Sequence, residues 1–278
     1  MESTFWERVV ADGHRVPQDR PLAELTTELT TMLGDPDPRR RDEIAYDVLA
    51  TWIGEGVYDD LLEGLGDGMA TGLRVGIGER ETDTVFRRSF SALVLAECVA
   101  RDNEAHLLPP EALLRWGDNT AGWLVRERDL RGFVPGKGWA HAVAHGADVL
   151  TALAGAESLG RLELTVLLDV IGDRLLAPTS YRLVHGEVDR LARATTTILR
   201  RNTVGLDVLE PWVARLAAAS VPSFEGKGDP FLVAGNVQDY LRALHLQVAL
   251  APDQPACRAD LLLVLIDHLR ATNPEYLG

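Results

Sequence analysis

The sequence predicts an all-α protein, built as a HEAT- or armadillo-like α-solenoid of antiparallel helix pairs. Three observations lead to this prediction. Apolar residues recur at helical spacing through nearly all of the 278 residues. No segment of about four to eight residues alternates apolar and polar side chains as a half-buried strand does. Glycine and proline separate the periodic segments, where their backbone constraints end helices.

The expected helices follow one another along the chain, and each break between them contains glycine or proline. The first helix ends at the segment 34–38, Gly-Asp-Pro-Asp-Pro, and the second at Gly54. The predicted ranges are 21–33, 39–53, 58–75, 82–101, 110–128, 139–156, 161–176, 187–201, 207–219, 236–250 and 257–271. The later breaks carry Gly76, Gly78, Pro109, Pro135, Gly136, Gly160, Pro178, Gly205, Pro222 and Pro252.

Every second expected helix begins near residue 39, 82, 138, 187 or 236, a spacing of about 45–55 residues. Antiparallel helix pairs at such a period are typical of solenoids, in which each repeat packs against its neighbours. We therefore expect one solenoid domain over 1–278, with a globular helix bundle as the alternative. One helix of each pair is expected to line a concave groove.

The composition excludes several classes of function. A net charge of −14 and a pI near 4.9 oppose nonspecific nucleic-acid binding, which requires Lys and Arg to neutralise phosphates. The same acidity disfavours anionic membranes. Cys98 and Cys257 have no partner at disulfide-framework or metal-binding spacing. The first residues lack the apolar region of a secretory signal, so we expect a soluble, cytoplasmic protein, with a composition typical of GC-rich bacteria.

The most informative segment is 131–148, in which a glycine-rich loop leads into an expected helix. His141, His145 and Asp148 follow the loop at helical spacing, so their side chains fall within one stripe about 60° wide. Trp139 and Val143 fall on the opposite side of that helix, where we expect them to be buried. The polar stripe then faces outward and forms the centre of a ligand site.

The histidine pair has three interpretations. Its i, i+4 spacing lets two imidazoles reach one metal ion, with Asp148 as a carboxylate ligand, so a divalent metal is one candidate cofactor. Ala142 follows His141, whereas the metalloprotease helix has glutamate at that position, so the general base of that chemistry is missing. Direct ligand binding and structural hydrogen bonding by His141 and His145 are the other two interpretations.

Lys137 lies in the glycine-rich loop before these residues, and a similar loop occupies 224–228. Glycines expose backbone N–H groups and lysine adds positive charge, a combination that favours an anion near a helix N-terminus. Neither loop has the spacing or the Ser/Thr of a nucleotide-binding P-loop, and ordinary inter-helix loops are the alternative. Outward-facing residues of other helices, expected to complete the groove or to form solvated ion pairs, are Arg88, Asp189, Arg193 and Arg242.

The chain contains no nucleophile-elbow or dinucleotide-binding motif. Glu97 falls on the apolar side of its helix, where we expect it to pair with an arginine of a neighbouring helix. The sequence therefore favours a solenoid whose groove binds an anionic small molecule or a peptide. A metal-dependent enzyme of hydrolase or oxygenase type and a protein-interaction scaffold are the alternatives that remain open.

The central segment also carries a resemblance. Glu127-Arg-Asp-Leu-Arg-Gly-Phe-Val134 and Gly138-Trp-Ala-His-Ala-Val-Ala-His-Gly-Ala-Asp148 resemble the signature of a bacterial family known as domain of unknown function 2785. The resemblance covers most of the chain, and its specific part is this central segment. It implies an all-helical, cytosolic protein and supplies no activity to transfer.

Overall fold

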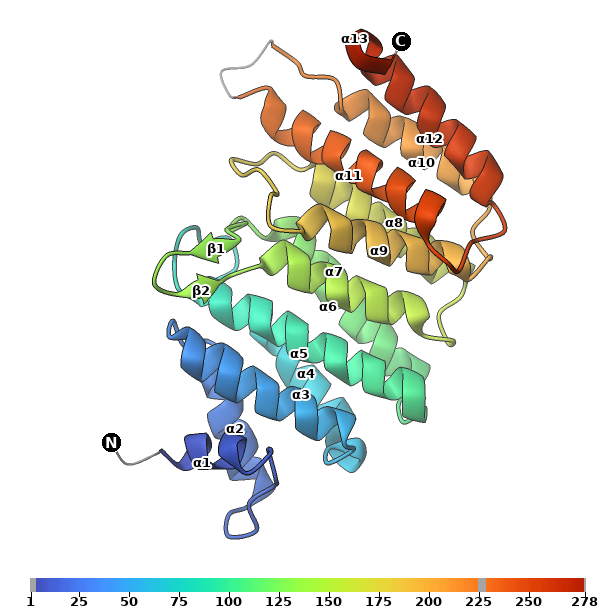
Figure 1. The fold of residues 1–278 in the computed structure, drawn as a ribbon. Helices are drawn as coiled ribbons and strands as arrows, with labels where there is room; N and C mark the ends of the chain where they lie inside the picture. Colours follow the sequence, from blue (N-terminus) through green and yellow to red (C-terminus); the bar gives the residue numbers. More distant parts are fainter. Residues whose placement is uncertain (1–3, 225–228, 278) are drawn as a thin grey trace. The chain divides into compact units, whose positions relative to one another are not determined.

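In the part of the chain that it describes, the computed structural model in Figure 1 is all-helical apart from one very short hairpin. The structure describes residues 4–224 and 229–277. The chain divides into two compact units, Met1–Val149 and Leu150–Gly278. Each unit has its own core and is described by itself.

The first unit holds the helices that position the segment of interest. Thr4 and Glu7 form a capping box that starts its first helix, which the sequence analysis did not predict. In chain order its elements are α1 (Phe5–Ala11), α2 (Leu22–Met32), the π-helix η1 (Arg39–Tyr46), α3 (Asp47–Gly54), the 3₁₀ turn η2 (Asp59–Leu61), α4 (Leu62–Gly72), α5 (Thr84–Ala105), α6 (Pro110–Arg126), β1 (Phe133–Val134), β2 (Gly138–Trp139) and the start of α7 (Ala142–Gly155).

Helix α5 is the centre of this unit, because it packs against both α3 and α4, and α4 in turn packs against α6 (Figure 1). Three fully buried tryptophans, Trp52, Trp116 and Trp123, fill the core around it. Arg88 and Ser91 of α5 are fully buried, so the prediction that Arg88 points outward is wrong. A helix covered on two sides has no solvent face in its middle turns, whatever its sequence pattern indicates.

The second unit consists of the remaining helices. Its elements are α8 (Arg161–Leu176), α9 (Glu187–Arg200), α10 (Leu206–Ala219), α11 (Phe231–Leu250), α12 (Arg258–Thr272) and α13 (Pro274–Leu277). Helix α11 packs against α9 and α12 (Figure 1). It begins five residues before the predicted start, where the Asp229 carboxylate accepts a hydrogen bond from the N–H of Phe231. On α9, Leu191 and Ala192 are buried, while Asp189 and Arg193 are exposed, as expected from the sequence.

The largest departure from the predicted elements lies between α6 and α7. Strands β1 and β2 pair antiparallel, with Phe133 opposite Trp139 and Val134 opposite Gly138. Gly136 and Gly138 have φ of 75° and 77°, values that favour glycine and allow the tight turn. The sequence analysis predicted no strand and began the helix at residue 139. Trp139 belongs to strand β2 of the hairpin instead, and α7 begins three residues later than predicted, at Ala142.

In the ranges 4–224 and 229–277, no helix combines the length and the apolar character needed to cross a membrane.

Candidate functional site

The hairpin is held against η1 by a buried arginine. The Arg41 side chain is fully buried, and its Nη2 donates a hydrogen bond to the carbonyl oxygen of Lys137 at 2.8 Å. Its guanidinium carbon lies 4.2 Å from the ring centroid of Phe86 and 4.8 Å from that of Phe90. Burial lowers the pKa of Arg41, although the neighbouring carboxylate of Asp42 opposes that shift. The buried Arg41 therefore fixes the turn of the hairpin to the core of the first unit.

Trp139 lies on the outer side of this hairpin. Its side chain is 40% exposed, so the prediction that it is buried in the core is wrong. The cause is the hairpin, since a residue on β2 does not follow the helical facing of α7. The Trp139 ring stacks on His141 at 4.3 Å between centroids and meets the exposed Phe133 ring edge-on at 5.1 Å. The three rings, Phe133, Trp139 and His141, are called the aromatic platform below.

His141 does not belong to the helix but precedes it. Its φ of 51° is left-handed, and its carbonyl oxygen accepts a hydrogen bond from the N–H of His145 at 2.9 Å, the first helical bond of α7. The left-handed residue turns the chain from strand to helix. A non-glycine residue in this region costs about 1–3 kcal/mol, and such residues are frequent at functional sites.

The predicted polar stripe does not face solvent. His141 and His145 are only 8% and 5% exposed, and Asp148 is half-buried. His145 Nδ1 donates to the carbonyl oxygen of Ser89 on α5 at 3.0 Å, and its ring meets Phe90 edge-on. The outward direction expected for the histidines is therefore wrong. Helix α7 is rich in alanine and apolar residues on all sides, and such a helix is buried all round.

Asp148 is close to two other polar groups of the first unit. Tyr46, at the end of η1, donates its hydroxyl hydrogen to Glu97 Oε1 at 2.8 Å. Burial raises the pKa of Tyr46, and the negative charges of Glu97 and Asp148 raise it further. The partner of Glu97 is thus a tyrosine and not the predicted arginine. The three residues Tyr46, Glu97 and Asp148 are called the acidic group below.

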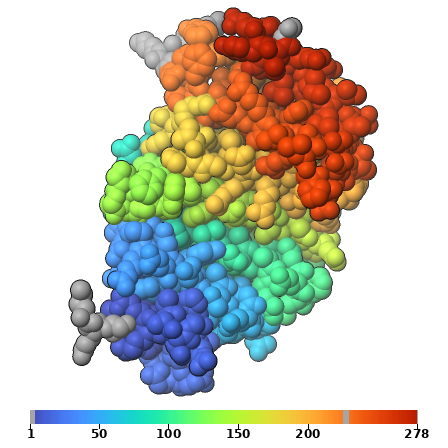
Figure 2. Space-filling model, viewed as in Figure 1, coloured from blue at the N-terminus to red at the C-terminus, as the bar shows by residue number. Residues whose placement is uncertain are grey.

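A series of ring contacts connects the aromatic platform with the acidic group. His141 lies 5.8 Å from His145, His145 lies 5.1 Å from Phe90, and Phe90 lies 6.4 Å from Tyr46. All these residues come from η1, α5 and the segment 133–148. The light green part of the space-filling view, which includes the hairpin, reaches the molecular surface (Figure 2).

The two cations predicted for an anion site in this unit are already paired with carboxylates. Lys137 Nζ lies 2.6 Å from Oδ1 of Asp83, the residue that precedes α5. Arg88 is fully buried and binds both oxygens of Glu127, while its Nη1 donates to the carbonyl oxygen of Val75 at 2.7 Å. Arg88 therefore has a structural role in the core of the unit.

The other three predicted site residues belong to the second unit. Arg242 is exposed and contacts Asp239 and Gln238, with Nη2 3.0 Å from Gln238 Oε1. The backbone carbonyl of Asp189 accepts a hydrogen bond from Gln247 at 2.9 Å. Arg193 is exposed on the same helix. In the predicted loop 224–228, residues 225–228 lie outside the described residues.

Within the described part of the chain, no group of three or more His, Cys, Asp and Glu residues is arranged to hold a metal ion. His141, His145 and Asp148 do not form such a set. The metal-dependent alternative is left without a ligand set among these residues.

Sequence analysis missed three residues that shape the site. Arg41, Tyr46 and Phe133 lie in segments whose local pattern indicates only a helix surface or a loop. The roles of Arg41 and Tyr46 come from contacts over long sequence distances, such as the 96 residues between Arg41 and Lys137, while Phe133 meets Trp139 only because the hairpin forms. One local signal was available, since glycine at 136 and 138 on either side of lysine is typical of tight turns.

The hairpin and the start of α7, residues 133–148, lie inside the region that a protein-family model matches. A family model described as "Protein of unknown function (DUF2785)" matches residues 73–246. No curated protein and no solved structure matches the chain. The family match extends over more than half of the sequence and includes the hairpin, both histidines and Asp148, and the protein belongs to this family.

Proposed function

We propose that the protein is a binding protein of HEAT-like architecture that recognises a peptide segment through the aromatic platform, whose exposed rings are Phe133 and Trp139. The observation that carries the proposal is the exposed Trp139 on an anchored hairpin. An aromatic ring held rigidly at the surface offers a large contact area at little cost in side-chain entropy, which is why such rings are enriched at binding surfaces.

The charges favour a peptide with cationic side chains. Lys137 and Arg88 are neutralised by Asp83 and Glu127, so they offer little to an anion. Carboxylates of the acidic group lie near the other end of the series of rings. Arginine or lysine side chains can stack on Trp139 by cation–π attraction, worth about 0.5–1 kcal/mol at exposed sites. The chain's net charge of −14 strengthens this preference.

The HEAT-like architecture is supported by the way helices stack within each unit. Helix α3 packs against α5 and α4 against α6, while α8 packs against α10, α9 against α11 and α10 against α12. Contacts between every second helix are typical of repeat proteins in which equivalent helices of successive repeats lie next to one another.

Intrinsic fluorescence tests the proposal, because the other five of the six tryptophans are buried. Two octapeptides serve as probes, one alternating glycine with arginine and one alternating glycine with aspartate. We expect the arginine peptide alone to change the emission, and the change to disappear in Trp139→Phe. The control is Trp212→Phe, which alters a buried tryptophan of the second unit. Equal responses to both peptides, or no response to either, would rule out recognition of a cationic peptide.

A further inference from the structure

Arg87 is a half-buried residue of α5 whose charge has no partner in the described part of the chain. Among residues 4–224 and 229–277, none accepts a hydrogen bond from its guanidinium or forms an ion pair with it. Burial lowers the pKa of Arg87, and no neighbouring carboxylate opposes that shift. Removing a cation from water without an acceptor costs free energy. The fold itself therefore leaves the charge of Arg87 uncompensated.

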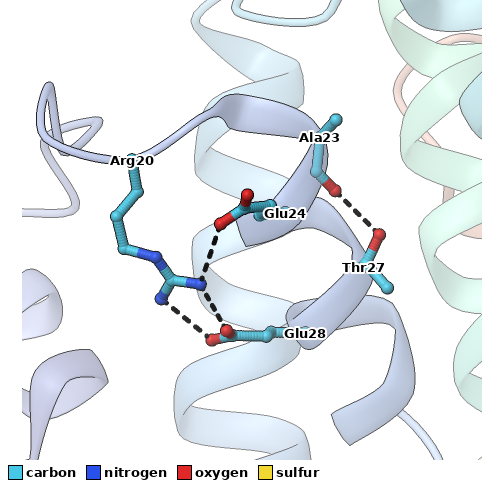
Figure 3. A pocket seen from close by; sticks show the side chains of 5 residues that line it. All are labelled: Arg20, Ala23, Glu24, Thr27 and Glu28. Carbon is cyan, nitrogen blue, oxygen red and sulfur yellow. Dashed lines mark hydrogen bonds and ion pairs between the residues drawn. The ribbon is translucent and has the colours of Figure 1, made fainter.

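Arg20, in the same unit, shows how an arginine in a polar pocket is usually satisfied. Figure 3 shows its guanidinium beside the carboxylates of Glu24 and Glu28, two residues of α2. The cation of that pocket is already neutralised, so the pocket offers little to an anion. Arg87 differs from Arg20 in having no such carboxylate.

The Arg87 side chain passes between the ends of two helices, where glycines make room for it. A Cβ added at Gly34, which follows α2, would lie 3.3 Å from Arg87 Cβ. A Cβ added at Gly72, the last residue of α4, would lie 3.3 Å from Arg87 Nε and 2.1 Å from Ser91 Oγ. Ser91 is fully buried, and its Oγ has no hydrogen-bond partner among the described residues. Two polar groups without acceptors thus lie next to each other on one face of α5.

The position of Arg87 in the helix adds to the unfavourable electrostatics. It lies in the first turn of α5, and the positive end of a helix favours anions over cations. Asp83, just before the helix, makes no capping hydrogen bond and pairs with Lys137. The negative end of α4, at Gly72, offsets part of the cost, but no described carbonyl oxygen accepts a hydrogen bond from Arg87. A small anion here would neutralise the guanidinium and lie beside the favourable end of α5.

We propose that Arg87 and Ser91 form a binding site for a phosphate group beside the start of α5. The planar fork of a guanidinium matches two oxygens of a phosphate or of a carboxylate. The Ser91 hydroxyl adds a donor for a further oxygen, which a phosphate group has and a carboxylate lacks. No hydrogen bond fixes the Arg87 side chain within the described residues, so its rotation admits the group from solvent to the buried hydroxyl.

Thermal melts of the full-length chain test the proposal. Sodium chloride, acetate and phosphate are compared at one pH and one ionic strength, and the measured quantity is the rise in melting temperature over chloride. For the wild type we expect a rise of roughly 2 °C or more in phosphate and a smaller one in acetate. In Arg87→Met the rise in phosphate should fall to the general effect of that ion on protein surfaces. Each variant is compared with itself in chloride, so its own stability does not enter the result.

Two further variants complete the experiment. Arg128→Met is the matched control, because it removes an exposed arginine and should keep the full rise in phosphate. Ser91→Ala should reduce the rise in phosphate to the level of acetate. O-phosphoserine blocked at both ends distinguishes the sources of the group: a rise at least equal to that of inorganic phosphate assigns the site to a phosphorylated partner segment, and a smaller rise assigns it to the free ion.

Two results would overturn the proposal. One is an equal rise in phosphate for the wild type and Arg87→Met, because Arg87 would then serve only the negative end of α4. The other is an equal rise in acetate and phosphate for the wild type, because the site would then not distinguish a phosphate group from a carboxylate.

Discussion

At the scale of single residues, Trp139 and the two histidines occupy the opposite environments from those that helical facing predicted. The difference starts at His141, whose left-handed backbone separates the hairpin from the helix. Residues before it follow the strand, so Trp139 turns outward, while His145 after it turns toward Ser89. One residue in an unusual conformation thus reverses the exposure of its neighbours on both sides.

This reversal predicts the order of two stability changes. His145→Ala removes a buried ring with its hydrogen bond to the carbonyl oxygen of Ser89 and its edge-on contact with Phe90, at a cost of about 1–3 kcal/mol. Trp139→Ala removes a 40% exposed ring and is expected to cost less than about 1 kcal/mol. Urea unfolding followed by circular dichroism measures both. A larger loss of unfolding free energy for Trp139→Ala than for His145→Ala would show that the Trp139 ring is buried in the core.

The ion pair between Arg88 and Glu127 is the second residue-scale case. Both side chains are fully buried, so Arg88→Met leaves the Glu127 carboxylate without its charged partner, at a cost of about 3–5 kcal/mol. Arg115→Met is the matched control, because Arg115 pairs with Glu63 and Asp67 while about half exposed, and we expect a much smaller loss of stability from it. Thermal melts of the two variants compare them directly. Similar decreases in melting temperature for the two variants would show that burial does not make the ion pair of Arg88 more important for stability than that of Arg115.

At the scale of elements, helix existence was predictable and local exceptions were not. Periodicity with Gly and Pro breaks placed helices at 161–176 and 110–128, and the structure has α8 at Arg161–Leu176 and α6 at Pro110–Arg126. The hairpin was missed because strands of two residues are too short to produce an alternating pattern. The π-helix η1 was read as part of a regular helix, since nothing in its composition distinguishes the two.

The glycines of α4 give a prediction at this scale. Gly66→Ala places a Cβ against Trp116 and is expected to destabilise the protein by about 1–3 kcal/mol, as overpacking does. Gly64→Ala, two residues away on the same helix, meets open space and is expected to stabilise it by about 0.5–1 kcal/mol. Chemical denaturation of both variants checks the signs. Changes of the same sign would show that the packing around α4 is not as described.

At the scale of the whole molecule, the polar groups of the candidate site find partners that are distant in the sequence. Tyr46 and Glu97 are 51 residues apart, and Arg88 and Glu127 are 39 apart. A local pattern assigns Arg88 or Glu97 to a helix face but cannot name the group that meets it after folding. The central segment could therefore be chosen from sequence, while the direction of its histidines and the charge of its surroundings could not.

Buried tyrosines give the last prediction, which concerns stability at alkaline pH. Burial raises the pKa of Tyr58 to about 12, and it also raises the pKa values of Tyr46 and Tyr240. An unfolded tyrosine ionises near pH 10. The folded state thus holds these protons more tightly than the unfolded state does. The resulting stability is complete below about pH 10 and is lost as pH rises through the folded pKa values.

For Tyr58 alone, a pKa difference of about two units corresponds to about 3 kcal/mol. Urea unfolding between about pH 8 and 12 should therefore show a steep loss of stability in the wild type. Tyr58→Phe should reduce that slope, because phenylalanine has no proton to release, while its unfolding free energy at pH 8 records separately the lost hydrogen bond to Thr26. An identical slope in Tyr58→Phe and wild type would mean that Tyr58 ionises in the folded protein as readily as in the unfolded chain.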